Sequence, residues 1–410
     1  MITDPRVPAP ERTIAVADGP VAAGIGTWPG VVELCTGTGD AIQIGATSDC
    51  RRFAASRLGE DPDAPPTRAT LRDDTARVLV YRAASAFEAD WLALTIARER
   101  LPALHAELAA RLRPPALVLR PDTGTWDARE LDPSDPIDPK SRVIAPIRTL
   151  EGARRLGAAI DEHFDLCRYP KEVLRAPRGT ACAYKEMGKC PAPCDGSEPL
   201  ADYLDRFALA ARTLEAGVPA WIDAQRTAMD DAARATDFER AASHKRTLDE
   251  LQTLPDDVRA GARALGGRVF AVVSRAPRRA RCRLWALGAD GLIPLATLEA
   301  RARRDTLARV LDTLRAQAPF DPAGATRPAL EEYGLVARAL HHKPQAGTTK
   351  RTRVLDAHDA TPATLADALA ACAGLDRTND PNPEGPGPDD PRPDEPDDPD
   401  REDPLSYNTA

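Results

Sequence analysis

Residues 181–196 read ACAYKEMGKCPAPCDG, and this stretch holds three of four cysteines that fall within 28 residues. The fourth lies upstream, which gives the spacing C-x14-C-x7-C-x3-C for Cys167, Cys182, Cys190 and Cys194. Two prolines stiffen the final loop and lower the entropic cost of directing two sulfurs at one centre. Four thiolates can complete a tetrahedral zinc site or hold a [4Fe–4S] cluster, and the spacing does not distinguish the two. The alternative is four reduced cysteines without a metal.

Composition excludes several classes of protein. The chain has 410 residues, a net charge of −8 and no apolar run of membrane-spanning length. Residues 376–410 contain 12 acidic residues, 3 basic residues and 9 prolines, so we expect an extended acidic tail beside a nearly neutral body. Residues 1–5 lack the basic start and apolar block of a secretory signal. We therefore expect a cytoplasmic protein with no membrane contact, whose cysteines are thiols or metal ligands.

A pair of helices is predicted over residues 218–256. Thr236 and Glu239 have the spacing of a capping box for the second helix, and alanines allow the two helices to approach closely. We expect Met229 and Phe238 to close the open end of this hairpin. Two short helices bury little surface alone, so the unit is either an ordinary helix pair within a domain or a docking element for a partner.

The remaining pattern predicts a multidomain α+β protein. Strands are expected at 31–34, 41–44 and 78–81, and a helix over 84–101. The expected units are a loose N-terminus (1–20), a small α/β domain (21–120), a linker (121–149), a helix with the four-cysteine region (150–217), the helical hairpin (218–256), a C-terminal α+β domain (257–375) and a disordered acidic tail (376–410).

The cysteine segment resembles that of the UvrC family, the nuclease subunit of nucleotide-excision repair, with a close match at Cys190-Pro191-Ala192-Pro193-Cys194. The resemblance implies a [4Fe–4S] cluster, with zinc as the alternative. Residues 229–251 resemble the UVR motif, which in the family contacts UvrB and which also occurs in adaptors of Clp-type ATPases. It implies a partner-binding surface formed by Met229, Phe238, Glu239, Ala241, Ala242 and Leu248.

Residues 29–93 resemble the GIY-YIG nuclease domain that opens UvrC proteins, but its catalytic residues are replaced. The two tyrosines, the arginine and the metal-binding glutamate of the family correspond to Val32, Gln43, Phe53 and Ala93. Phosphodiester cleavage there needs a proton-transfer group, a cation and a carboxylate for one divalent metal. Arg51, Arg52 and Glu88 are the possible substitutes. We expect no active endonuclease, and Mg²⁺ or Mn²⁺ only if activity survives.

An arginine-rich turn follows the helical hairpin and is suited to contact phosphates without sequence specificity. Its candidate DNA-binding residues are Arg275, Arg278, Arg279 and Arg281. The combined expectation is a non-catalytic DNA-repair accessory protein that binds a UvrB-like helicase subunit and DNA. The alternatives are a divergent short excinuclease, or an adaptor for a Clp-type ATPase with no role on DNA.

Overall fold

The computed structural model describes residues 2, 4–61, 70–341 and 352–374, and over these residues it contains three four-stranded antiparallel sheets. The expected multidomain α+β class is confirmed at that level. The predicted acidic tail lies outside the described residues. Within the described part, no helix is long and apolar enough to cross a bilayer.

The N-terminal sheet has the strand order β1-β4-β2-β3. Val32 and Leu34 face a core that includes residues of α1, whereas Val31 and Ile44 face a core that includes α2, so the two helices cover opposite faces of the sheet. The strands expected at 31–34 and 41–44 are present as β2 and β3, which pair as an antiparallel hairpin. The elements are β1 (Arg12–Ala15), β2 (Gly30–Cys35), β3 (Ala41–Thr47), α1 (Cys50–Leu58), β4 (Arg77–Arg82), α2 (Ala86–Arg100) and α3 (Pro102–Ala110).

The expectation of a loose N-terminus over residues 1–20 is wrong. β1 pairs with β4 along its whole length. Arg6 forms an ion pair with Asp4 and reaches the C-terminal part of the chain, where it contacts Glu332 at 3.1 Å. These contacts hold the segment in place despite its prolines, because they satisfy its backbone and charged groups.

The middle sheet has the order β6-β5-β7-β8 and corrects the expected linker. Residues 121–149 contain β6 (Thr125–Glu130) and β7 (Arg142–Ala145), and both pair with β5 (Pro115–Arg120). The N-terminal domain, expected over residues 21–120, therefore ends before β5, which belongs to the middle sheet. β8 (Arg263–Ala264) joins β7 from the far side of the helical hairpin. Leu156 and Ile160 on α4 (Leu150–His163) pack with Phe207 and Leu214 on α7 (Leu200–Ala216) in the core of this sheet.

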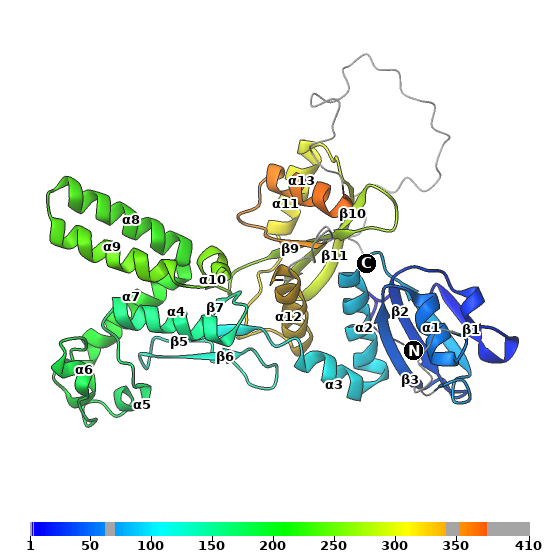
Figure 1. The fold of residues 1–410 in the computed structure, drawn as a ribbon, viewed down its shortest axis with the longest axis horizontal. Coiled ribbons are helices and arrows are strands. Elements are labelled where there is room, and N and C mark those ends of the chain that lie inside the picture. The colour runs from blue at the N-terminus through cyan, green and yellow to red at the C-terminus, as the bar shows by residue number, and fades with distance from the viewer. Residues whose placement is uncertain (1, 3, 62–69, 342–351, 375–410) are drawn as a thin grey trace, which may run out of the picture.

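Two extensions leave the middle sheet (Figure 1). The cysteine lobe, residues 165–199, contains the short helices α5 (Pro170–Val173), α6 (Ala183–Glu186) and η3 (Pro193–Asp195). The helical hairpin consists of α8 (Val218–Arg234) and α9 (Phe238–Gln252), close to the predicted bounds, and α10 (Asp256–Gly261) follows it.

The C-terminal sheet has the order β11-β10-β9-β12 and is covered on both faces. α11 (Arg304–Arg315) and α13 (Pro362–Ala373) pack on one face, and α12 (Arg327–His341) packs on the other and also meets α2. Trp285 on β10 contacts Phe87 and Trp91 of α2, with ring centroids 6.1 and 5.1 Å apart. The strands are β9 (Phe270–Arg275), β10 (Arg281–Gly288), β11 (Gly291–Glu299) and β12 (Thr352–Asp356).

Buried charges on α12 strengthen this junction between the N-terminal and C-terminal domains. Glu332 is fully buried and accepts hydrogen bonds from the Trp91 indole at 3.2 Å and from the Leu292 amide at 2.6 Å. Glu331 contacts Arg98 at 3.1 Å and His105 at 2.9 Å. Because a buried carboxylate requires such partners, this junction fixes the position of α2.

Candidate functional site

The face of the N-terminal sheet that α1 covers is filled by uncharged side chains. Val32 is fully buried there, and Gln43 lies opposite Leu34 in the strand register, on this same face. The Phe53 ring lies so close to Gly45 that a β-carbon at Gly45 would come within 2.3 Å of it. Three of the positions that the sequence analysis aligned with catalytic residues therefore lie on one face, in a packed and mainly apolar cluster.

Ala93, the fourth replaced position, lies on the opposite side of the sheet. It belongs to α2 and is buried in the core that contains Val31 and Ile44. A side chain at Ala93 in this structure faces that core and not the face that carries Val32. Ala93, which the sequence analysis aligned with the family's glutamate, thus lies on the opposite face of the sheet from Val32 and Phe53.

The proposed substitutes are engaged elsewhere or exposed. Glu88 is buried, forms an ion pair with Arg283 of β10 and accepts a hydrogen bond from the Ala84 amide at 2.9 Å. Burial raises the pKa of Glu88, and the charge of Arg283 opposes that rise. The Arg51 guanidinium donates to the Ile25 carbonyl at 2.6 Å, whereas Arg52 is exposed on α1. Glu88 is therefore a structural residue here, which corrects its candidacy as a metal ligand.

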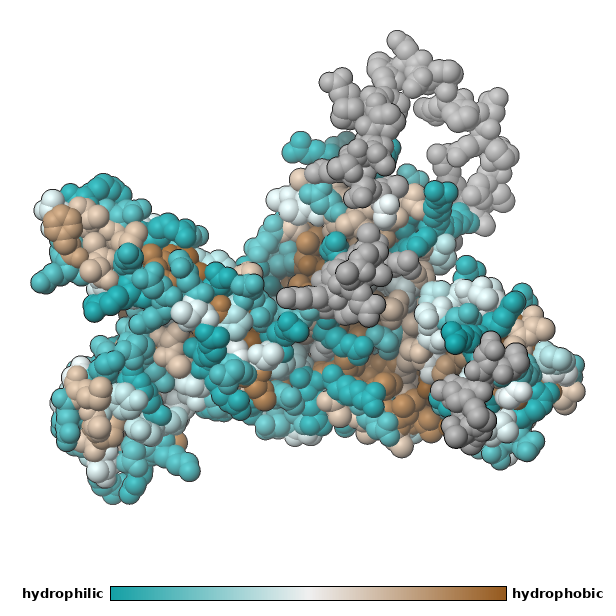
Figure 2. Space-filling model, in the orientation of Figure 1, coloured by the Kyte–Doolittle hydropathy of each residue, from teal (hydrophilic) through white to brown (hydrophobic). Residues whose placement is uncertain are grey.

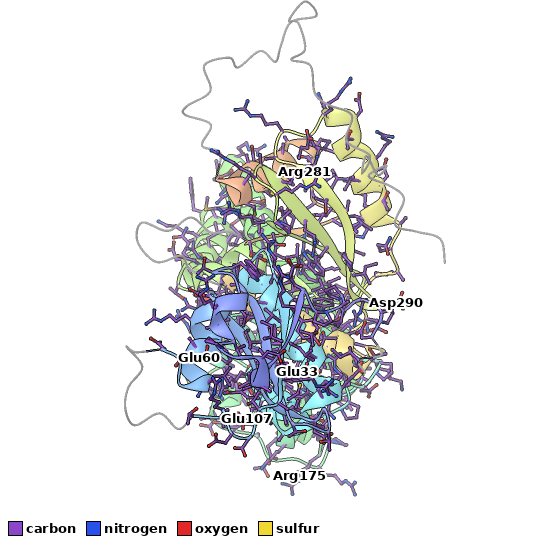
Figure 3. The ribbon with its side chains drawn as sticks, turned by 90° about the vertical axis from the view of Figure 1, so that its right-hand side faces the viewer. Glu33, Glu60, Glu107, Arg175, Arg281 and Asp290 are labelled. Carbon is purple, nitrogen blue, oxygen red and sulfur yellow. The ribbon has the colours of Figure 1, made fainter. Side chains whose placement is uncertain are left out.

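A buried polar cluster that the sequence analysis missed lies on the α2 side of the sheet. Glu33 is fully buried and accepts hydrogen bonds from the Tyr81 hydroxyl at 3.2 Å and from the Arg100 guanidinium at 2.8 Å. Burial and the nearby Glu33 charge raise the pKa of Tyr81. Figure 3 labels Glu33 within the N-terminal domain. A carboxylate inside the apolar strand 30–35 was the signal in the sequence, because such a group requires partners.

The cysteine lobe brings Cys167 and Cys190 into contact and places Cys194 near them. A hydrogen bond from the Cys167 thiol lowers the pKa of Cys190, and the same bond and burial raise that of Cys167. Burial and the charge of nearby Cys190 raise the pKa of Cys194, whose thiol is 3.6 Å from the Thr180 carbonyl. Cys182 is half-buried at the start of α6.

The fit of a metal to this lobe is partial. Buried thiols from two segments suit a soft metal or an iron–sulfur cluster. Yet among the described residues no three His, Cys, Asp or Glu side chains are placed around one point as a metal requires. A four-cysteine site therefore needs the cysteines to move closer together than they lie here.

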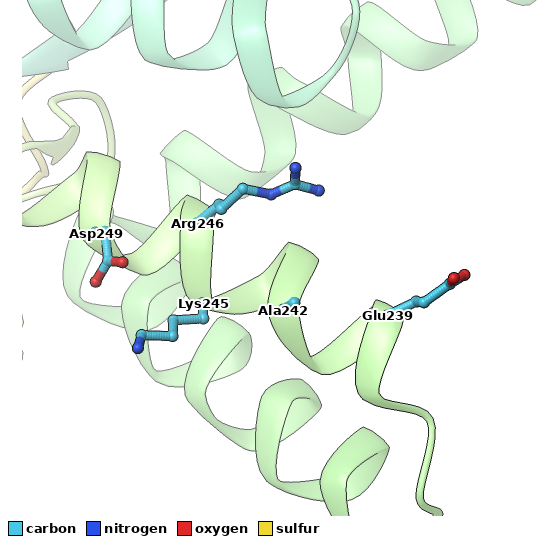
Figure 4. Close-up of a pocket in the computed structure, with 5 residues that line it drawn as sticks. All are labelled: Glu239, Ala242, Lys245, Arg246 and Asp249. Carbon is cyan, nitrogen blue, oxygen red and sulfur yellow. The ribbon is translucent and has the colours of Figure 1, made fainter.

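The hairpin exposes much of its predicted docking surface. Phe238 is 72% exposed at the start of α9, so the prediction that Phe238 and Met229 close the open end is wrong for Phe238. Leu248 is buried between the helices, Met229 and Ala241 are half-buried, and Ala242 is exposed. A shallow groove runs along the outer face of α9, lined by Glu239, Ala242, Lys245, Arg246 and Asp249 (Figure 4).

The predicted capping box is also wrong. Thr236 has a left-handed backbone with φ of 58°, and its hydroxyl bonds to the Ala235 carbonyl. Asp237 is the N-cap of α9, and its carboxylate accepts the Arg240 amide at 3.1 Å. The cap is thus one residue later than the sequence pattern indicates.

The arginine-rich turn between β9 and β10 lies beside a second basic turn. The Ala300 amide donates to the Ala280 carbonyl at 2.7 Å, which joins residues 276–280 to the turn before α11. Arg279 is exposed, and Arg281 makes only a long contact of 3.7 Å with Glu299. Seven arginines lie in these two turns or next to them, and all are exposed or half-exposed: Arg275, Arg278, Arg279, Arg281, Arg301, Arg303 and Arg304.

The fold and these sites define a multidomain α+β protein in which an N-terminal sheet domain joins a cysteine-bearing domain and an exposed helical hairpin. Residues 125–213 match the model of the UvrC/Cho excinuclease middle domain. Over this segment the chain is similar to UvrC-family proteins.

Three curated relatives are each named UvrABC system protein C. The protein from Nitratidesulfovibrio vulgaris is 30% identical over 58% of this chain and 34% of its own length. Those from Haloarcula marismortui and Chlorobium luteolum are 28% and 24% identical, over 37% and 62% of this chain and 27% and 39% of their own. The chain thus spans about a third of the length of these relatives. No solved structure gives a significant match.

Proposed function

We propose that this chain is a non-catalytic accessory protein of nucleotide-excision repair, which recruits a UvrB-like helicase subunit and DNA. The observation that carries this proposal is the α1 face of the N-terminal sheet. Val32, Gln43 and the Phe53 ring occupy the positions where the family places proton-transfer and cationic groups. Removal of a single group that stabilises the transition state lowers kcat by about 10²–10³-fold, and here several are replaced.

A nicking assay tests the absence of incision. Lesion-bearing duplex DNA is incubated with the chain and Mg²⁺ or Mn²⁺, with and without a UvrB-like subunit. We expect no nick above the buffer control. Metal-dependent incision that disappears in Arg52→Ala would establish the divergent excinuclease instead, because Arg52 is an exposed cation on α1 and a candidate substitute for the missing arginine.

Docking is proposed to occur through the hairpin. Exposed apolar side chains favour a partner when polar groups surround them, and Phe238 is the most exposed of the large apolar residues described. The groove along α9 is lined by acidic residues, Glu239 and Asp249, and by basic residues, Lys245 and Arg246. An amphipathic helix pair of the partner can pack on such a surface.

A pull-down with paired variants tests this docking. Phe238→Ala is expected to weaken retention of a UvrB-like subunit at least tenfold. Leu209→Ala is the matched control, since Leu209 is a 48% exposed apolar residue on α7. Retention of a Clp-type ATPase in place of the UvrB-like subunit would favour the adaptor function.

The cysteine lobe is proposed to hold a [4Fe–4S] cluster, with zinc as the alternative. Cys167, Cys190 and Cys194 would supply three thiolates and Cys182 the fourth. Such a centre would stabilise the lobe, which has little apolar core of its own. Anaerobic purification followed by metal analysis and an absorption spectrum distinguishes iron, zinc and no metal, with Cys282→Ala as the control cysteine.

A further inference from the structure

A pocket of about 320 Å³ lies between the middle sheet and the cysteine lobe. It is formed where β6, α4 and the segment before α5 meet. Its volume is at the lower end of small-molecule sites. Its apolar walls come from Trp126, Ala128 and Pro170, and its polar groups include Arg154, Asp161 and Arg168.

The aromatic wall of this pocket is held in a fixed orientation. Gly157 leaves room for the Trp126 ring, because a β-carbon at Gly157 would come within 2.5 Å of it. The indole nitrogen donates to the Asp161 carboxylate at 2.8 Å. Asp161 is only 4% exposed, so the pocket contains a nearly buried carboxyl group next to a rigid aromatic ring. Such preorganisation is typical of a binding site.

Arg168 provides a hydrogen-bond donor at the same place. Its guanidinium lies 4.4 Å from the Tyr184 ring and forms an ion pair with Glu162. Its Nη1 is shielded from solvent and has no hydrogen-bond partner among the residues that the structure describes. Because Nη1 is shielded, a ligand reaches this donor only when the Arg168 side chain shifts toward the pocket that it lines.

The approach to the pocket is basic and aromatic. Lys171 on α5 and Arg175 just after it are exposed, and Figure 3 shows Arg175 at one end of the molecule. Tyr169 is 50% exposed and its ring is 6.2 Å from that of Tyr184. In Figure 2 the lobe formed by α5 and α6 shows pale and light-brown residues among hydrophilic ones. Exposed aromatics among cations are the pattern of single-stranded nucleic-acid surfaces.

We propose that this pocket binds the base of one unpaired nucleotide in single-stranded DNA. The base stacks on Trp126, and its polar edge pairs with Asp161 and the free donor of Arg168. Lys171 and Arg154 contact the flanking phosphates. A small inorganic anion would leave the aromatic wall without a partner, which is why the pocket favours a base. The inference rests on the proposed role on DNA but not on the hairpin.

Fluorescence anisotropy with a labelled thymidine oligonucleotide, compared with the same backbone lacking its bases, tests this assignment. We expect the full chain to bind the oligonucleotide about tenfold more tightly than the abasic strand, because stacking of a base contributes selectively. Asp161→Asn, which keeps the side-chain shape, and Trp126→Leu should abolish this difference. Arg226→Ala on α8 is the control for a lost surface charge and should preserve it.

Several outcomes overturn the proposal. Equal affinity for the normal and abasic strands would do so, as would preferential binding of intact duplex. Retention of the difference in Asp161→Asn would also do so, even if Trp126→Leu fails to fold. Arg279→Ala separates this inference from the wider DNA role, because that variant should weaken both strands alike. If Arg279→Ala behaves so while no base preference exists, only the pocket assignment fails.

Discussion

The N-terminal sheet and the cysteine lobe are the two places where the sequence predicts chemistry, and they are built in opposite ways. On the sheet, apolar packing fills the expected catalytic face, and ion pairs join α2 to the C-terminal domain. Where the lobe meets α4, the Cys167 thiol, the buried Asp161 carboxyl and the Arg168 guanidinium line a pocket. Apolar side chains pack without further partners, whereas buried polar groups require hydrogen-bond or charged partners.

The largest expected effect concerns the junction that closes the N-terminal domain. Glu332→Ala removes the acceptor of the buried Trp91 indole and Leu292 amide, and one of the two carboxylates that Arg6 contacts. We expect a loss of about 3–5 kcal/mol in the free energy of unfolding, measured by urea denaturation. Glu299→Ala is the control, because that side chain is 72% exposed. A loss below about 1 kcal/mol would mean that the two domains do not depend on this carboxylate.

The buried carboxyl of Asp161 should make the free energy of unfolding depend on pH. Burial raises the pKa of Asp161 from 3.8 to about 7, which the hydrogen bond from Trp126 only partly opposes. The folded state therefore binds a proton more tightly than the unfolded state, so this stabilisation is present below pH 4 and is lost as pH rises to 7.

The isosteric variant Asp161→Asn lacks that titration. Between pH 4 and pH 8 the free energy of unfolding of the wild-type chain should fall by about 2–4 kcal/mol relative to the variant. Urea denaturation at the two pH values, followed by tryptophan fluorescence, measures the difference. Parallel behaviour of the two chains would show that Asp161 ionises normally and that the pocket is more hydrated than its burial indicates.

Local patterns predicted the elements whose signals are contained in a short window. The hairpin of strands 30–47, the helix over residues 86–100 and both helices of the hairpin follow from apolar spacing and turn residues. The strands at 125–130 and 142–145 escaped because aspartates and prolines flank them. They are strands because β5 and β8 supply their backbone partners, and no local pattern contains that information.

The site was predictable only in part for the same reason. The four cysteines and the replaced nuclease residues are visible in the sequence. The pairing of Glu88 with Arg283 is not, since 195 residues separate them. Nor is the contact between the two arginine-rich turns, which depends on the register of β10 and β11. Tertiary placement decides which charged residues are free to act.

A substitution on the α1 face tests whether packing has replaced chemistry there. Gly45→Ala places a methyl group against the Phe53 ring, so we expect a loss of about 1–3 kcal/mol in stability. Phe53→Ala should relieve the clash, and the double variant should recover much of the loss that Gly45→Ala causes alone. A double-mutant cycle by thermal denaturation measures this coupling. Additive effects would show that the ring moves freely and that the face is not closely packed.

The smallest effect distinguishes the cap observed at α9 from the one that the sequence suggested. Asp237→Ala removes the acceptor of the Arg240 amide and should lower stability by about 1 kcal/mol. Thr236→Gly should instead raise stability slightly, because glycine adopts the left-handed conformation at this position without strain. Both variants leave Phe238 exposed, so partner docking should persist in the folded fraction. A larger loss for Thr236→Gly than for Asp237→Ala, measured by circular dichroism, would restore the capping box at Thr236.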